Sequence, residues 1–215
     1  MAQDCAMRVE PVDWSVVVVG FWNRAILTPA GVGRRLFQLQ EGTPLQVEIP
    51  LEGLAPYRVR HEGLIVTAGN RRLEIATESP SIPSLERAMT AAATAIDSLP
   101  ETPLSAAGFN ARFNIHDPPD ELTEAFMTSL DQRISDADLT IASRQIQRTV
   151  KYGEGVLNIQ VLEETPTKVS LNFHLDSTNS NALKQWLRTP INDVERTVDL
   201  VMDKVIGVSL AEMSL

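Results

Sequence analysis

Apolar and polar residues in the first half of the chain follow a pattern that predicts a strand, a short helix, further strands and a long helix. A valine run at residues 16–19 predicts a first strand over 13–26 with both faces covered. Thr28 followed by Pro29 indicates a helix start, because threonine caps a helix and proline fits its first turn. The other expected elements are strands over 45–49, 56–61, 63–67 and 72–76, and a helix over 81–99.

The expected helix over 81–99 carries an apolar stripe. Its apolar residues recur at spacings of three and four, which places them on one helix face. We expect this face to be buried through Leu85, Ala88, Met89, Ala92 and Ile96. Pro100 and Pro103 then stop regular structure and mark a connector between two halves of the chain.

The second half of the chain predicts the same order of elements. A strand over 104–115 precedes a helix that opens at Asp117 and Pro118 and runs to about residue 137. Apolar residues recur at every fourth position of this helix and are expected to be buried: Leu122, Phe126, Leu130 and Ile134. Strands over 139–152, 155–163 and 168–174 follow, and then a helix over 182–206, either continuous or broken near Thr189 and Pro190.

A short motif supports an internal duplication. Residues 20–24 and 108–112 share the pattern Gly-Phe-x-x-Arg, and each copy is expected to end a strand-like run. We therefore predict an α+β fold of two tandem β-α-β-β-β-α repeats, residues 1–103 and 104–215, packed as one globular body. The repeats would form a pseudo-twofold, mainly antiparallel sheet of roughly eight strands, with helices on one face and the other face open.

This element order resembles the tandem fold of the TATA-box-binding protein family, in which two copies form a saddle. The sequence contains no motif of that family, so the resemblance concerns architecture alone, and it implies a concave sheet that binds nucleic acid. Residues 108–114, and the segment 171–176 with the helix after it, resemble a sporadically distributed, uncharacterised bacterial family. This second resemblance implies no activity, because the family has no established catalytic residues.

Composition indicates a cytoplasmic globular protein. Hydrophobic residues make up 43% of the 215 positions, which is enough for a core, and no apolar run approaches the ~20 residues of a membrane span. The N-terminus lacks the charged and apolar regions of a secretory signal. The single cysteine, Cys5, cannot form an internal disulfide, and we expect it to be an incidental residue of the tail.

The net charge of −9 bears on the class of partner. A protein that binds nucleic acid by neutralising phosphates is normally basic, so the charge disfavours that role. A local basic patch would still be compatible with it.

Residue patterns give no sign of catalysis. The sequence has no metal-ligand spacing, no phosphate-binding loop and no nucleophile motif. His174 and Asp176 are two residues apart, so one strand face would bring them together for a hydrolase or transferase, a role that polar strand ends explain equally well. We therefore predict a non-enzymatic protein without a cofactor or a metal.

Arg24 and Arg112 are candidate binding residues because each ends one copy of the shared motif. A pseudo-twofold would place them in equivalent environments. They would then form two anion sites or, as the favoured alternative, structural ion pairs with Glu62 and Glu154.

Four more arginines are candidates because they lie on expected strands. Arg58 and Arg60 share one strand face, and Arg144 and Arg148 share another. An open sheet face with arginine and glutamine binds a partner protein or a nucleic-acid backbone, although such residues are more often the wet side of a sheet.

Three functions remain as hypotheses. The first is a protein-binding or assembly module that uses an exposed sheet face or edge, with a protein partner or a second copy of the chain. The second is a nucleic-acid-binding saddle that uses Arg58, Arg60, Arg144 and Arg148. The third is a small-ligand or hydrolytic site between the repeats.

Overall fold

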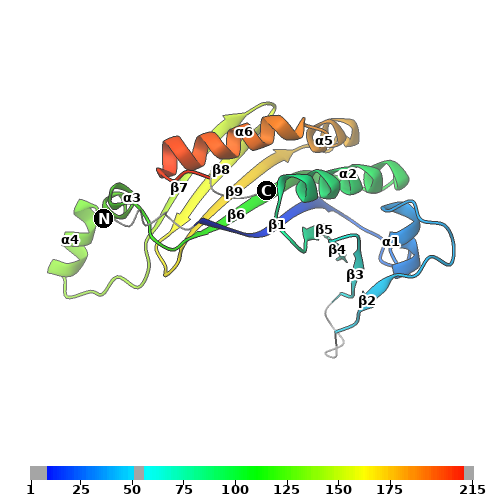
Figure 1. Cartoon of the computed structure of the whole chain (residues 1–215), viewed down its shortest axis with the longest axis horizontal. Helices are drawn as coiled ribbons and strands as arrows, with labels where there is room; N and C mark the ends of the chain where they lie inside the picture. Colours follow the sequence, from blue (N-terminus) through cyan, green and yellow to red (C-terminus); the bar gives the residue numbers. More distant parts are fainter. Residues whose placement is uncertain (1–8, 51–55, 211–215) are drawn as a thin grey trace, which may run out of the picture.

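The described residues form one mainly antiparallel sheet of nine strands (Figure 1). The computed structural model describes residues 9–50 and 56–210. All pairings among the described strands are antiparallel, and the order is β2-β3-β4-β5-β1-β6-β9-β8-β7. The fold is therefore α+β with a single sheet, as the sequence predicts.

The two longest strands lie side by side at the centre of the sheet. They are β1 (Val9–Gly20) and β6 (Leu104–Ile115), and Val16 lies opposite Phe109. Strands from the first half of the chain lie beyond β1: β5 (Arg72–Thr77), β4 (Leu64–Ala68), β3 (Arg58–His61) and β2 (Gln46–Glu48). Strands from the second half lie beyond β6: β9 (Thr167–Asp176), β8 (Gly155–Leu162) and β7 (Gln145–Tyr152).

The long helices cover one face of this sheet (Figure 1). They are α2 (Ile82–Ser98), α5 (Ser180–Leu187) and α6 (Ile191–Val201), the last continued by one wider turn, η1 (Met202–Ile206). The apolar stripe predicted for α2 is buried in full. A break at Pro190 separates α5 from α6, which decides between the two predicted forms of the terminal helix.

Local capping explains where these helices begin. The Thr28 hydroxyl accepts a hydrogen bond from the Gly31 amide at 3.1 Å and starts α1 (Pro29–Arg35), as predicted. Ser81 and Ser84 form a reciprocal capping box at the start of α2, and the Asn179 side chain caps α5.

The prediction of one helix from Asp117 to residue 137 is wrong. The segment forms two short helices, α3 (Asp120–Ala125) and α4 (Ser129–Asp136), because Thr128 and Asp131 make a second capping box inside it. No residue of α4 is buried, and Leu130 is 60% exposed, since no sheet lies beneath this helix.

Two strands differ most from their predicted bounds. The first strand begins at Val9 and ends at Gly20, rather than covering 13–26, and β7 begins at Gln145 rather than at residue 139. At the first strand, the apolar run continues past Gly20 into a turn that buries Leu27. Before β7, by contrast, the apolar Leu139 lies outside the sheet and is 64% exposed.

The core lies between the sheet and the long helices. The Phe109 and Phe173 rings stack with centroids 4.6 Å apart, and Phe113 meets Trp14 edge to face. All four side chains are buried, so they fix the centre of the sheet against the helices.

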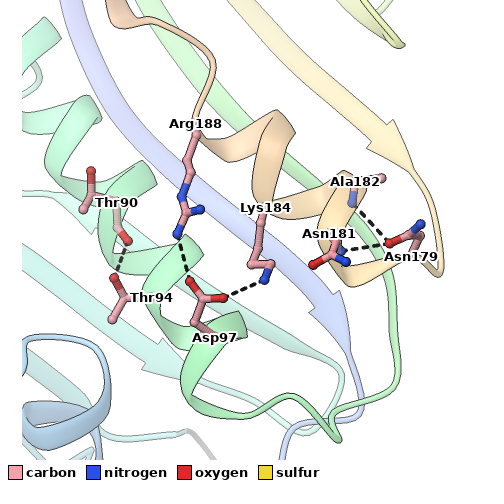
Figure 2. A network of polar contacts seen from close by, with 8 residues as sticks. All are labelled: Thr90, Thr94, Asp97, Asn179, Asn181, Ala182, Lys184 and Arg188. Carbon is pink, nitrogen blue, oxygen red and sulfur yellow. Dashed lines mark hydrogen bonds and ion pairs between the residues drawn. The ribbon is translucent and has the colours of Figure 1, made fainter.

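An ion-pair network joins the helices of the two halves above the sheet. Asp97, on α2, contacts Lys184 Nζ at 2.7 Å and Arg188 Nη2 at 2.8 Å, both from the α5 segment (Figure 2). Hydrogen bonds to these two cations hold the pKa of the Asp97 carboxyl below its usual value, although burial opposes the shift.

Candidate functional site

The sheet face opposite the long helices carries a continuous row of polar side chains. One residue from each of five neighbouring strands contributes: Thr149, Asn158, Asn172, Asn110 and Ser15. Hydrogen bonds of 2.7, 3.0, 2.8 and 3.3 Å connect them in that order. We call this row the polar ladder. Its amide groups are largely satisfied by one another, so the ladder stiffens the open face.

A depression of about 870 Å³ lies beside the polar ladder, over strands of the first half. Charged side chains of both signs line it: Arg58, Arg72, Arg112, Asp13, Glu48 and Glu74. Arg72 lies 3.3 Å from Glu74 and Arg58 lies 4.0 Å from Glu48, so its charges are largely compensated internally.

Arg60 lies on the same face as Arg58 but is held by two carboxylates. Its guanidinium contacts Glu48 at 2.6 Å and Glu78 at 2.5 Å. The hydrogen bonds to these carboxylates raise the pKa of Arg60, the Glu48 bond most strongly. An anionic ligand would have to displace both acids, which makes Arg60 a structural rather than a free cation.

The other pair of strand arginines lies on the opposite face of the sheet. Arg148 is paired with Ile159, whose side chain belongs to the core. Arg144 contacts Asp131 at 3.2 Å and Glu163 at 2.8 Å, and thus ties α4 to the end of β8. Arg58, Arg60, Arg144 and Arg148 are therefore not brought together on one surface.

The expectation that Arg24 and Arg112 occupy equivalent positions is wrong. Arg24 follows the end of β1 in a turn, whereas Arg112 lies within β6 and donates to the Asp13 carbonyl at 3.3 Å. The shared motif misled because Gly20 ends its strand while Gly108 lies in the middle of one. In the described part of the chain, neither arginine forms an ion pair with Glu62 or Glu154.

His174 and Asp176 do meet on β9, with 3.0 Å between Nε2 and Oδ1. Asp176 is largely exposed, and both residues lie on the open face. Among the described residues, no group of three or more His, Cys, Asp or Glu side chains could hold a metal ion. Cys5 lies outside the described residues.

The free edge of β7 is the feature that sequence patterns alone did not single out. The Glu163 amide donates to the Arg144 carbonyl at 2.9 Å, and the β7–β8 register continues from this pair without a bulge. Because main-chain groups of alternate residues point to opposite sides of an antiparallel strand, Ile146, Arg148 and Val150 pair with β8. The residues between them present their N–H and C=O groups outward: Gln145, Gln147, Thr149 and Lys151.

This edge is long and basic. It contains eight residues and no acid, whereas the opposite edge strand, β2, has only three residues. Arg148 and Lys151 form no ion pair with any described residue. The Arg148 guanidinium instead donates to the outward Gln147 carbonyl at 2.8 Å, a contact that shields part of the edge.

No helix in the described part of the chain combines the length and apolarity that crossing a membrane requires. No protein-family model, curated protein or solved structure matches this chain.

Proposed function

We propose that this chain is a protein-binding module whose β7 edge accepts an extended segment of a partner protein as an additional strand. The proposal rests on the outward main-chain donors and acceptors of Gln145, Gln147, Thr149 and Lys151, which pair with no strand in the described part of the chain. Such groups supply affinity through the main chain of the partner, while side chains along the edge select it. The function requires neither a catalytic residue nor a cofactor.

Charge favours an acidic partner segment. Arg148 and Lys151 are uncompensated and lie on opposite faces of β7, so an added strand would meet one cation on each face. Pairing of β7 with β7 of a second copy would bring four cations together, and these would repel one another. The net charge of −9 on each copy adds a further repulsion between the two copies. An acidic segment of a different protein is therefore the favoured occupant.

We infer that the scaffold behind this edge arose from duplication, with a pseudo-twofold between β1 and β6. The support is the order of elements, since in each half the chain passes from its central strand to the sheet edge, returns strand by strand to the centre and then sends a helix over one face. In this view β7 corresponds to β3, and the second half lacks a counterpart of β2. The β7 edge is thus the position where the duplicated half has one strand fewer.

Nucleic-acid binding through the open face has less support. Carboxylates hold Arg60 and Arg144, and the depression beside the polar ladder contains as many acidic as basic side chains. Counterion release by phosphate neutralisation would therefore be small.

A pair of variants at Gln147 tests the proposal. Its N–H points away from β8, so Gln147→Pro removes an outward donor and places a ring on the edge without breaking the β7–β8 ladder. Gln147→Ala keeps the main-chain donor and serves as the matched control. The probe is a labelled eight-residue peptide that alternates glutamate and valine, with a lysine–valine peptide of the same length for comparison.

Fluorescence anisotropy with the full chain measures binding. We expect the glutamate peptide to bind the wild-type chain and Gln147→Ala alike, and Gln147→Pro to bind it about tenfold more weakly. The lysine peptide should bind least. Equal affinity for both peptides, or equal binding by both variants, would overturn the proposal.

A further inference from the structure

The three tryptophans of the chain differ in how their indole N–H groups are satisfied. Trp14 Nε1 donates to the Arg112 carbonyl and Trp22 Nε1 to the Val18 carbonyl, each at 3.0 Å. Trp186 Nε1 has no hydrogen-bond partner among the residues that the structure describes, although Trp186 is only 6% exposed. A buried donor without a partner is rare and costly, so Trp186 requires an explanation that its two counterparts do not.

A second buried polar atom lies beside the first. Tyr152 Oη makes no well-formed hydrogen bond with a described residue, although a contact with the Thr197 side chain acts to lower its pKa. The Tyr152 ring meets the Trp186 ring edge to face, with centroids 5.6 Å apart. Burial raises the pKa of Tyr152, which keeps the phenol neutral. The pair therefore offers one obligate donor and one hydroxyl that can donate.

Both side chains line the same pocket. It has a volume of about 490 Å³ and lies where the turn between β7 and β8 faces the junction of α5 and α6. Its lining is mainly apolar and includes Leu175, Ala182 and Gly153. The volume is in the range of pockets that hold small organic molecules.

The turn glycines make room for the tryptophan ring. A Cβ atom on Gly155 would lie 2.9 Å from the Trp186 ring and 2.3 Å from the His174 carbonyl oxygen. The close approach of the β7–β8 turn to the indole therefore requires glycine at position 155, and it holds the ring at the pocket wall.

Charges around the pocket restrict the ligand. Arg196 is paired with Asp193 at 2.5 Å, which leaves the Glu154 carboxylate as the unbalanced charge of the lining. An anion would be repelled, whereas a neutral acceptor would satisfy the unpaired Trp186 donor and would also accept from the Tyr152 hydroxyl.

We propose that this pocket binds an uncharged, ring-bearing small molecule whose carbonyl oxygen accepts hydrogen bonds from Trp186 Nε1 and Tyr152 Oη. Because neither atom is accessible to solvent, the proposal requires both donors to turn toward the pocket as the ligand enters. This site is separate from the outward groups of the β7 edge, and either proposal can fail without the other.

Nuclear magnetic resonance of the ¹⁵N-labelled full chain tests the site through its three indole N–H signals. Benzamide is the probe, and benzoate and benzylamine are the anionic and cationic comparisons of similar size. We expect benzamide to shift the Trp186 signal saturably, while the Trp14 and Trp22 signals stay in place because their donors are already bound to carbonyls. Trp186→Phe assigns the signal by its disappearance.

Tyr152→Phe provides the second measurement. It removes the hydroxyl and keeps the ring, so benzamide should bind about fivefold more weakly, the factor expected for one neutral hydrogen bond. The proposal is overturned if benzamide leaves the Trp186 signal unmoved, if all three signals move together, or if benzoate binds as tightly as benzamide.

Discussion

Two tyrosine hydroxyls in this chain have opposite surroundings. Tyr57 Oη donates to the Leu27 carbonyl, whereas among the described residues Tyr152 Oη has only a weak contact with the Thr197 side chain. The same chemical change at the two positions should therefore have different consequences. Tyr57→Phe leaves a buried carbonyl unpaired, while Tyr152→Phe removes a desolvated hydroxyl that has no well-formed hydrogen bond to lose.

We predict that Tyr57→Phe lowers the free energy of unfolding by about 1 kcal/mol, and that Tyr152→Phe leaves it unchanged or raises it slightly. Urea unfolding of both variants beside the wild-type chain measures the difference. A loss at Tyr152 equal to that at Tyr57 would contradict this difference and would mean that the Tyr152–Thr197 contact is a full hydrogen bond.

Asp97 predicts a dependence of stability on pH. Lys184, most strongly, and Arg188 hold its pKa below the ordinary value of 3.8, so the ion pairs stabilise the fold above that value. Their contribution is lost as the pH falls through the lowered pKa of the folded state. Since the Asp97 side chain is 42% exposed, solvent screening limits the contribution to below about 1 kcal/mol.

The corresponding variant is Asp97→Asn. Its unfolding free energy should lie below that of the wild-type chain at pH 7, and the two should converge in strong acid, where Asp97 is protonated. Glu101→Gln is the control, because Glu101 is exposed and has no ion pair with a described residue. A deficit of Asp97→Asn that persists in strong acid would show that packing, not charge, is lost.

At the scale of single elements, the polar ladder stabilises the open face through its central amide. Asn172 accepts from Asn158 at 3.0 Å and donates to Asn110 at 2.8 Å. Asn172→Ala should cost about 1–3 kcal/mol, because it leaves a donor and an acceptor unpaired on two neighbouring strands.

Ser170→Ala is the matched control on the same strand and face. Its hydroxyl takes part in no side-chain hydrogen bond of the ladder, so the change should stay within about 0.5 kcal/mol. Thermal unfolding of the two variants decides the question. Equal effects would mean that the amides exchange their partners for water at no cost.

Element prediction succeeded where caps and periodicity agreed. Thr28 and Pro29 predicted the start of α1, and the apolar stripe predicted α2. Both signals are local in the sequence, so no knowledge of distant contacts was needed. The prediction for the α3–α4 segment was wrong because it followed the apolar spacing of four residues alone. The capping box at Thr128 starts a new helix within that spacing. Strand-face alternation predicted that Arg58 and Arg60 share a face, but it could not give the side on which a distant strand presents Arg148.

At the scale of the whole molecule, the sequence predicted one sheet with helices above it but not the functional surfaces. Strand order depends on contacts between residues far apart in the chain, such as Val16 opposite Phe109. The free side of β7 follows from that order, and so does the meeting of Tyr152 with Trp186. The shared motif also wrongly predicted equivalent positions for Arg24 and Arg112. A short motif does not determine where it lies along its strand in the sheet.

Amide hydrogen exchange along β7 tests the central proposal most directly. In the free chain, we expect Ile146, Arg148 and Val150 to be protected by β8, and Gln145, Gln147, Thr149 and Lys151 to exchange rapidly. Addition of the glutamate–valine peptide should slow exchange at the second set and leave the first unchanged. Binding of the peptide with the second set still exchanging rapidly would contradict strand addition at the β7 edge.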